Sequence, residues 1–328
     1  MFAMLVTEIG KPLQPGEAPA LTPGPGEALI EVEACGVNFA DLLMRDGKYQ
    51  ERRDPPFAPG MEAAGRIVAL GEGATGRAEA GGGLAVGDRV VALGRGAMAE
   101  EMIAKIGLCA KIPDGVSMAE AAAMPIAYGT SHIALARRAD LKPGERLLVL
   151  GAAGGVGLTA VEIGALMGAE VIAGARGQER LAIARAHGAK HLIDTDATED
   201  LKAAVKALGG ADVVYDPVGG ALGEAAFRAT NQGGRVLPIG FAAGGPPVYP
   251  SNIVMVKNLT IIGLYWGAHV NAHPADFGFT LRACFDWRRE GRLEPLISDI
   301  LPLREANEAL RLLAERKAKG KVVLTAER

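Results

Sequence analysis

The chain has 328 residues, enough for two domains, of which 49% are apolar and 22% charged. Its formal net charge of −3, with no basic block, argues against nucleic acid as the main partner, and no apolar run is long enough to span a bilayer. Three widely separated cysteines, and a start that lacks a basic segment and a long apolar core, predict a cytoplasmic protein without a disulfide framework.

The first part of the chain, up to about residue 118, is expected to be rich in strands. Strands are predicted at 28–34, 66–70 and 88–93, between prolines and glycines that favour turns. The glycine- and alanine-rich stretch 71–87 is interpreted as a mobile surface loop with no chemistry of its own. Two helices are expected next, at 117–124 with Ser117 as the N-cap and at 128–136.

From residue 146 onward, strands and helices alternate, which predicts a parallel sheet with helices on both faces. The expected strands are 147–150, 170–175, 191–194, 212–215, 235–239 and 259–264. The expected helices include 178–187 and 200–208, and the tail adds helices at 277–291 and 304–319 and a strand at 321–324. We expect this last strand to return to the first domain.

A glycine-rich turn follows the strand at 147–150 and precedes a helix. It reads Ala152-x-Gly154-x-x-Gly157, with Ala152 in the place of the usual first glycine. Backbone N–H groups in such a turn, together with the dipole of the helix N-terminus, bind a pyrophosphate. The sequence therefore predicts a dinucleotide site; a merely flexible glycine loop would not explain the flanking strand and helix. The turn residues assigned to the cofactor are Ala153, Gly154, Gly155 and Val156.

The end of the next strand indicates which dinucleotide is bound. This strand ends in Ala175 and Arg176, without the acidic residue that binds the ribose hydroxyls of NAD. Arg176 could instead pair with the 2′-phosphate, so the cofactor is predicted to be NADPH. The alternative is a solvated arginine, or one paired with Glu179. Thr195, directly after the third strand, is also assigned to the cofactor site.

In the order of its parts, the chain resembles the zinc-free NADPH:quinone oxidoreductase (zeta-crystallin-like) branch of the medium-chain dehydrogenase/reductase superfamily. The segments that carry the resemblance are 34–41 (ACGVNFAD), 47–49, 59–65 (PGMEAAG), 87–90, 128–130, the glycine turn and 215–220 (YDPVGG). The resemblance covers nearly the whole chain. It implies an α/β protein with a GroES-like β-rich domain at 1–118 and 267–328, a Rossmann domain with a doubly wound parallel sheet at 119–266, an active site in the cleft between them, and a homodimer.

Zinc-dependent members of the superfamily place a cysteine and a histidine where this chain has Asn38 and Met61. An amide and a thioether are poor zinc ligands, and the closely spaced cysteines of the structural zinc lobe are absent, so no metal is expected. Cys35 is interpreted as a small buried residue. His269 and His273 are expected in a loop, because Gly267 and Pro274 disfavour a helix.

Without zinc to polarise a carbonyl, the acceptor must already be electrophilic, as quinones and α,β-unsaturated carbonyls are. We expect Asn38 to donate a hydrogen bond to the developing oxyanion, and Tyr49 to donate a proton or to hold nicotinamide and substrate. Asn38 could instead cap a helix that begins near Phe39, and Tyr49 could simply shield the cleft.

The resemblance also implies residues for the nicotinamide half of the cofactor site. Thr130 is expected to hold the nicotinamide amide. The others are Gly240, Phe241, Leu264, Tyr265 and Trp266. Tyr265 and Trp266 could equally be core or dimer contacts.

Two other functions stay open. A 2-enoyl-CoA (enoyl thioester) reductase would need a basic patch for the coenzyme A phosphates, for which Arg45, Lys48, Arg52 and Arg53 are the candidates. A protein that binds NADPH with little turnover is the second. Some relatives bind RNA, but the net charge lends that no support here.

Overall fold

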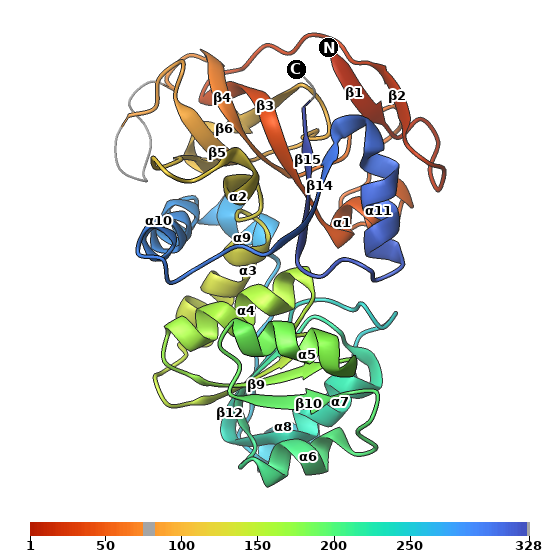
Figure 1. Ribbon diagram of the computed structural model, residues 1–328, viewed down its shortest axis with the longest axis vertical. Helices are drawn as coiled ribbons and strands as arrows, with labels where there is room; N and C mark the ends of the chain where they lie inside the picture. The colour runs from red at the N-terminus through yellow and green to blue at the C-terminus, as the bar shows by residue number, and fades with distance from the viewer. Residues whose placement is uncertain (75–82, 327–328) are drawn as a thin grey trace. The chain divides into compact units, whose positions relative to one another are not determined.

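The computed structural model describes residues 1–74 and 83–326, which form two compact units (Figure 1). Unit 1 consists of Met1–Gly129 and Val270–Arg328, and unit 2 of Thr130–His269. The units thus divide after residues 129 and 269, whereas the domain boundaries predicted from the sequence follow residues 118 and 266. The central part of the predicted loop at 71–87 lies outside the described residues.

Unit 1 is built on a seven-stranded sheet with the order β14-β15-β3-β4-β5-β7, in which β6 also pairs with β3. A separate antiparallel pair joins β1 to β2. The strands are β1 (Phe2–Leu5), β2 (Gln14–Glu17), β3 (Glu27–Val37), β4 (Glu62–Leu70), β5 (Arg89–Leu93), β6 (Glu101–Lys105), β7 (Cys109–Lys111), β14 (Ile297–Pro302) and β15 (Lys321–Thr325). The predicted return of the last strand is confirmed, because β15 pairs antiparallel with β3.

The helices of unit 1 range from 5 to 15 residues in length, and two of them begin at predicted cap positions. They are α1 (Phe39–Arg45), α2 (Met118–Ala122), α10 (Ala275–Arg289) and α11 (Ala306–Ala314), with the 3-10 turns η1 (Ile106–Leu108) and η3 (Leu303–Glu305). The Ser117 hydroxyl accepts a hydrogen bond from the backbone N–H of Glu120 at 3.2 Å, and the Glu120 carboxylate accepts one from the backbone N–H of Ser117 at 2.9 Å. This capping box confirms the predicted N-cap of α2.

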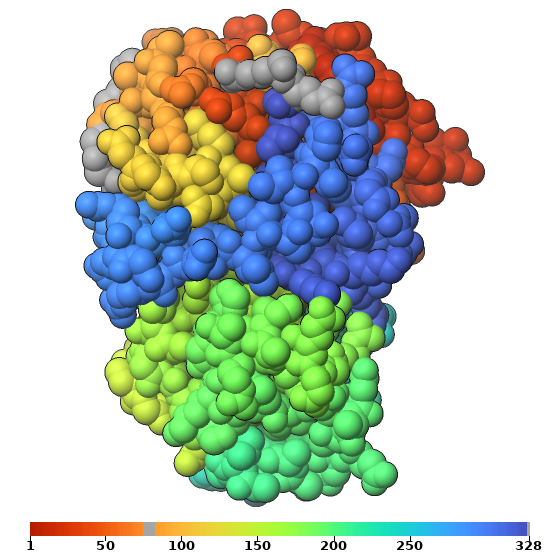
Figure 2. All heavy atoms as spheres, viewed as in Figure 1, coloured from red at the N-terminus to blue at the C-terminus, as the bar shows by residue number. Residues whose placement is uncertain are grey.

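The two ends of the chain lie side by side in unit 1. Asn307 of α11 accepts a hydrogen bond from the backbone N–H of Leu13 at 2.8 Å and donates one to its carbonyl at 2.9 Å. Figure 2 shows the blue C-terminal residues against the red N-terminal ones on this face.

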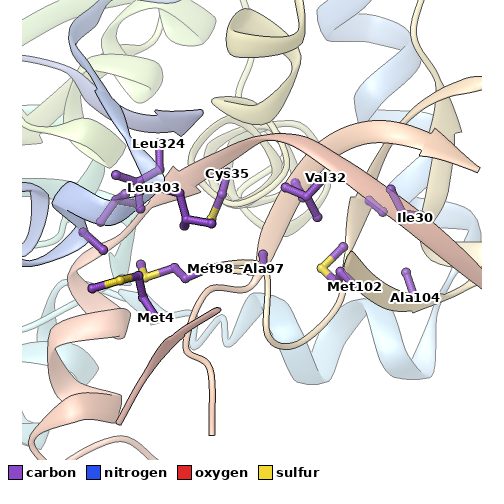
Figure 3. Packing of buried hydrophobic residues seen from close by; sticks show 14 of the residues in the cluster. Met4, Ile30, Val32, Cys35, Ala97, Met98, Met102, Ala104, Leu303 and Leu324 are labelled. Atoms are coloured by element: carbon purple, nitrogen blue, oxygen red, sulfur yellow. The ribbon is translucent and has the colours of Figure 1, made fainter. Parts of the chain in front are cut away.

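The apolar core of unit 1 encloses the cysteine of the first motif. Cys35 of β3 is 1% exposed and belongs to the same buried cluster as Met4, Met98 and Leu324 (Figure 3). Burial raises the pKa of its thiol. The prediction that Cys35 is a small buried residue is confirmed.

Unit 2 is a parallel six-stranded sheet with the order β10-β9-β8-β11-β12-β13. The strands are β8 (Arg146–Leu150), β9 (Glu170–Ala175), β10 (His191–Asp194), β11 (Ala211–Asp216), β12 (Thr230–Pro238) and β13 (Thr260–Ile261). The chain runs outward from β8 to one edge and then returns to continue from β11 to the other edge. This is the strand order of the Rossmann fold, which binds a dinucleotide at the carboxyl ends of the strands where the order reverses, here β8 and β11.

The helices around these strands are α3 (Ala127–Ile133), the π-helical turn η2 (Ala134–Arg138), α4 (Gly155–Leu166), α5 (Gly177–Ala186), α6 (Leu201–Ala207), α7 (Gly220–Ala229), α8 (Ser251–Val256) and α9 (Trp266–Ala272). Of these, α3 and α9 each include residues of both units. None of the helices within residues 1–74 and 83–326 is long and apolar enough to cross a membrane.

Two expectations for this region need correction. The strand predicted at 259–264 is paired only at Thr260–Ile261. The loop predicted around His269 is wrong, because His269 lies on α9 and its ring stacks on Trp266 with a centroid distance of 6.1 Å. Pro274 lies beyond the last residue of α9, where it removes no hydrogen bond from the helix.

Candidate functional site

The glycine turn of unit 2 is shaped by the close approach of α4 to the end of β8. A Cβ atom on Gly157 would lie 2.2 Å from the carbonyl oxygen of Gly151, so only glycine permits this packing. Gly151 has φ of +60°, and Gly154 is the N-cap of α4, with no side chain to cap the helix. The first N–H groups of α4 therefore lack a capping side chain, as a phosphate-binding helix terminus requires. Ala153 is buried here, while Gly155 and Val156 are partly exposed.

The end of β9 carries the residue predicted to choose the cofactor. Ala175 is buried, whereas Arg176 is exposed and forms the N-cap of α5 without a side-chain capping bond. The backbone N–H of Thr195 donates to the carbonyl of Ala175 at 2.9 Å, so these three predicted residues lie together at the ends of β9 and β10.

Asp194, which was not assigned to the site from the sequence, binds the N-terminus of the same helix, α5. Its carboxylate accepts hydrogen bonds from the backbone N–H of Gly177 at 3.0 Å and of Asp196 at 3.1 Å. These bonds, led by the one from Gly177, hold the pKa of Asp194 below its ordinary value. The only signal in the sequence was an aspartate at the end of the strand 191–194.

The ends of β11 and β12 meet around a buried carboxyl group. Asp216 accepts hydrogen bonds from the backbone N–H groups of Val218 at 2.9 Å and Gly219 at 2.8 Å, and burial raises its pKa. The backbone N–H of Gly240 donates to the carbonyl oxygen of Asp216 at 3.3 Å. Gly240 therefore lies at the carboxyl end of β11, and Phe241 beside it is 48% exposed.

The remaining residues predicted for the nicotinamide half differ in exposure. Thr130 on α3 is 8% exposed and Leu264 is half-buried. Tyr265 is 38% exposed, while Trp266 is 5% exposed. The burial of Trp266 agrees with the core alternative, and the assignment of all four to the cofactor stays a prediction.

In unit 1, Asn38 links the end of β3 to the start of α1. It is the N-cap of α1, and the Asp41 carboxylate accepts a hydrogen bond from its backbone N–H at 2.8 Å. Asn38 thus occupies the N-cap position that the helix-capping alternative expected, but its side chain makes no capping hydrogen bond. Its side-chain amide has separate partners: Nδ2 donates to Glu62 Oε1 at 2.7 Å and to the Gly36 carbonyl at 3.4 Å.

A buried ion pair completes this cluster. Lys321 Nζ lies 2.7 Å from Glu62 Oε1, and the two side chains are 5% and 0% exposed. Lys321 also donates to Asn38 Oδ1 at 2.9 Å, and Glu62 Oε2 accepts from the backbone N–H of Ile126 at 2.7 Å. Asp41 is buried beside them, and this burial raises its pKa to about 7.

Comparison with known proteins agrees with this architecture. Residues 24–114 match the alcohol dehydrogenase GroES-like domain family, and residues 155–279 match the zinc-binding dehydrogenase family. The quinone oxidoreductase-like protein 2 homolog of Nematostella vectensis is 38% identical over 98% of this chain and 88% of its own length. The chain belongs to the quinone oxidoreductase family of the medium-chain dehydrogenase/reductase superfamily.

Solved structures of this family superpose closely on the chain. A mycobacterial protein complexed with NADPH matches with a TM-score of 0.90 and 31% identity over 99% of both chains. The quinone oxidoreductase from Thermus thermophilus, also solved in complex with NADPH, matches with a TM-score of 0.83 and 34% identity over 99% of this chain and 100% of that chain.

Although one matching family model is described as zinc-binding, the donor set of this family member does not fit zinc. The amide nitrogen of Asn38 is hydrogen-bonded to Glu62, and the neighbouring position is the thioether of Met61. Within the described residues, no group of three or more His, Cys, Asp or Glu side chains could hold a metal ion. Amide nitrogen and thioether are weak ligands for zinc.

Two residues of the unit 1 cluster were missed from the sequence. Glu62 lies next to Met61 in the segment 59–65, and Lys321 begins the last strand. The sequence around these two residues does not indicate that their charges are buried. Tyr49, the other predicted catalytic residue, follows α1, is half-buried, and donates its backbone N–H to the carbonyl of Leu43 at 3.1 Å.

Proposed function

We propose that this family member is an NADPH-dependent oxidoreductase that transfers a hydride to a quinone or an α,β-unsaturated carbonyl without a metal. The observation that carries the proposal is Asn38, an amide held between two buried charges where zinc-dependent relatives need a thiolate. The names of the relatives, and the NADPH bound in two similar structures, support it further.

The residues of unit 2 fit the proposed cofactor. The turn leaves no room for a side chain at Gly157, and the N-terminus of α4 is uncapped, which suits a pyrophosphate. Arg176 is exposed and makes no side-chain capping bond to α5, which suits the 2′-phosphate of NADPH. Thr130, Gly240, Phe241 and the segment 264–266 are proposed to hold the nicotinamide half.

When bound, the reduced nicotinamide supplies a hydride to an acceptor carbon, and the displaced π electrons move onto the acceptor oxygen. In the proposed mechanism Asn38 donates a hydrogen bond to that oxygen as its charge develops. Tyr49 or water then supplies the proton. An acceptor whose anion is already delocalised, as in a quinone or an enone, needs no Lewis acid for this step.

A 2-enoyl-CoA reductase is less well supported. Of the basic residues that could form its phosphate site, Arg45 pairs with Asp46 at 2.9 Å and Arg53 lies over the ring of Phe57 at 5.3 Å. These contacts engage the guanidinium groups of two of the four candidates, whereas Lys48 and Arg52 are exposed. Binding of NADPH with little turnover remains the alternative outside catalysis. A cytoplasmic location and a homodimeric state are proposed as well.

The test is NADPH oxidation by the purified protein against a panel of quinones, alkenals, enones and enoyl-CoA esters. We expect turnover with the simple quinones or enones and little with the thioesters. Asn38→Ala should lower kcat by about a hundredfold, as loss of one oxyanion donor does. Asn252→Ala, an exposed position on α8, serves as the matched control and should not change kcat. NADPH binding without turnover on any acceptor would contradict the proposal.

A further inference from the structure

The buried ammonium group of Lys321 is fully engaged by acceptors. Lys321 begins β15, which pairs with β3, and its Nζ donates to Glu62 Oε1 at 2.7 Å, Asn38 Oδ1 at 2.9 Å and the Val37 carbonyl at 3.2 Å. A lysine has three N–H donors, so all three are used. A side chain 5% exposed that keeps its charge needs such complete pairing, because an unpaired buried charge is very costly.

The two charged neighbours determine which way the Asn38 amide points. Lys321 can only donate, so the Asn38 atom beside it is the oxygen; the Glu62 carboxylate can only accept, so the atom beside it is the nitrogen. If the amide were flipped, donor would face donor and acceptor would face acceptor. The ion pair therefore permits one orientation of Asn38.

The two hydrogens on Asn38 Nδ2 are held unequally. One is bound to the Glu62 carboxylate at 2.7 Å, a short distance typical of a hydrogen bond to a charged group. The other faces the Gly36 carbonyl at 3.4 Å, near the limit for a hydrogen bond. The first hydrogen anchors the amide, and the second is available to a better acceptor.

The local packing preserves this arrangement. A Cβ atom on Gly36 would lie 2.3 Å from Glu62 Oε1, so glycine at this position leaves the space that the carboxylate occupies. Glu62 is also fixed from its other oxygen by the backbone N–H of Ile126 at 2.7 Å. Both charges of the pair are thus held by backbone groups as well as by each other.

We propose that Lys321 is a positioning residue for hydride transfer: with Glu62 it orients the Asn38 amide and, by hydrogen bonding to its oxygen, strengthens its second N–H as a donor to the reduced acceptor's oxygen. Hydrogen bonds in a chain polarise one another, so a cation on the amide oxygen makes the amide N–H a better donor. The inference rests on the proposed function, because it assigns Asn38 to the oxyanion. Lys321 itself touches no reacting atom in this scheme.

The test compares variants of the ion pair with a matched surface lysine. Lys321→Met alone leaves Glu62 uncompensated, so the informative variant is Lys321→Met/Glu62→Gln, which removes both charges and keeps one amide oxygen as an acceptor for either Asn38 or the backbone N–H of Ile126. Lys317→Met, whose lysine is exposed and paired with Glu315, is the control. Quinone-dependent kcat, the KM for NADPH and thermal unfolding are measured for each.

We expect the double variant to lose kcat by about tenfold to a hundredfold, less than the loss of the donor itself. Its KM for NADPH should stay within about twofold of the wild type, since uniform cofactor binding is untouched. Lys321→Arg, which can still donate to both partners, should recover part of kcat. A double variant that unfolds at a lower temperature but retains its kcat would overturn the inference and leave the ion pair a purely structural role.

A second readout does not depend on turnover. In a nitrogen-15 NMR spectrum of the wild-type protein, the Asn38 side-chain proton bound to Glu62 should lie downfield of the same proton in a solvent-exposed asparagine. It should move back toward the exposed value in the double variant. A wild-type shift equal to that of an exposed asparagine would refute the orientation of Asn38 even if the variant does not fold. Absence of turnover in the wild type would refute the proposed function and leave the orientation to be judged by this spectrum.

Discussion

Replacement of Arg176 by alanine should weaken NADPH binding selectively. The side chain is exposed and makes no capping bond to α5. Asp194 accepts the hydrogen bond from the backbone N–H of Gly177 at that helix N-terminus, so removal of the Arg176 side chain should not disturb the fold. Hydrogen bonds to charged groups contribute about 1.5–3 kcal/mol, or about ten- to a hundredfold in affinity. Because solvent screens an exposed arginine, we expect the lower end, about tenfold.

The assay is a fluorescence titration of NADPH and NADH with the wild type, Arg176→Ala and Arg185→Ala. Arg185 lies on the same helix and is exposed at its other end, so it controls for the change in net charge. NADPH should bind more weakly only to Arg176→Ala, and NADH equally well to all three, since NADH lacks the 2′-phosphate. Equal weakening of both cofactors would mean that Arg176 supports the turn itself. A wild type that prefers NADH would refute the cofactor assignment.

Four further outcomes are expected. Activity should survive chelation, and mass spectrometry should find no stoichiometric zinc; complete loss with a chelator that zinc restores would refute this. Light scattering should report a dimer, since the edge strand 260–261 can pair with a second copy; a monomer at micromolar concentration would count against it. The free energy of unfolding should fall by on the order of 4 kcal/mol as pH rises from about 4 to 7, because burial raises the pKa of Asp41 from 3.8 to about 7 and the folded state keeps a proton that the unfolded chain releases. Urea titrations at several pH values should show this fall for the wild type and not for Asp41→Asn. The same pH dependence of stability in both proteins would contradict the prediction. Gly157→Ala should abolish measurable NADPH binding, because its Cβ would lie 2.2 Å from a carbonyl oxygen at the end of β8. The control Gly263→Ala should bind NADPH normally, because a Cβ atom there would have no other atom within 4 Å. Equal binding by both variants would show that the turn tolerates a side chain.

Much of the fold could be predicted because its signals are local. The apolar strand before the glycine turn and the alternation that follows it predict a parallel sheet, and β9 and β10 begin and end at the predicted residues. The sequence predicted α9 poorly because Gly267 and Pro274 were treated as breakers. In the structure Gly267 lies in the first turn of α9 and Pro274 beyond its end, where both are tolerated.

The candidate site was predictable only in part, for the same reason. The phosphate-binding turn depends on residues a few positions apart, so its spacing is visible in the sequence. The contact between Lys321 and Glu62 joins residues 259 positions apart, and it exists only because β15 returns to pair with β3. A lysine at the start of a strand is usually exposed, so its burial could not be inferred from the local pattern.

The most direct test of metal-free hydride transfer from NADPH is an isotope experiment with the metal-depleted wild-type protein. NADPH carrying deuterium at both positions on C4 of the nicotinamide is oxidised in the presence of an enone, and the product is analysed by mass spectrometry. The proposed function predicts one deuterium at the β-carbon of the saturated ketone, with no requirement for added zinc. A product without deuterium, or deuterium transfer that occurs only after zinc is added, would contradict it.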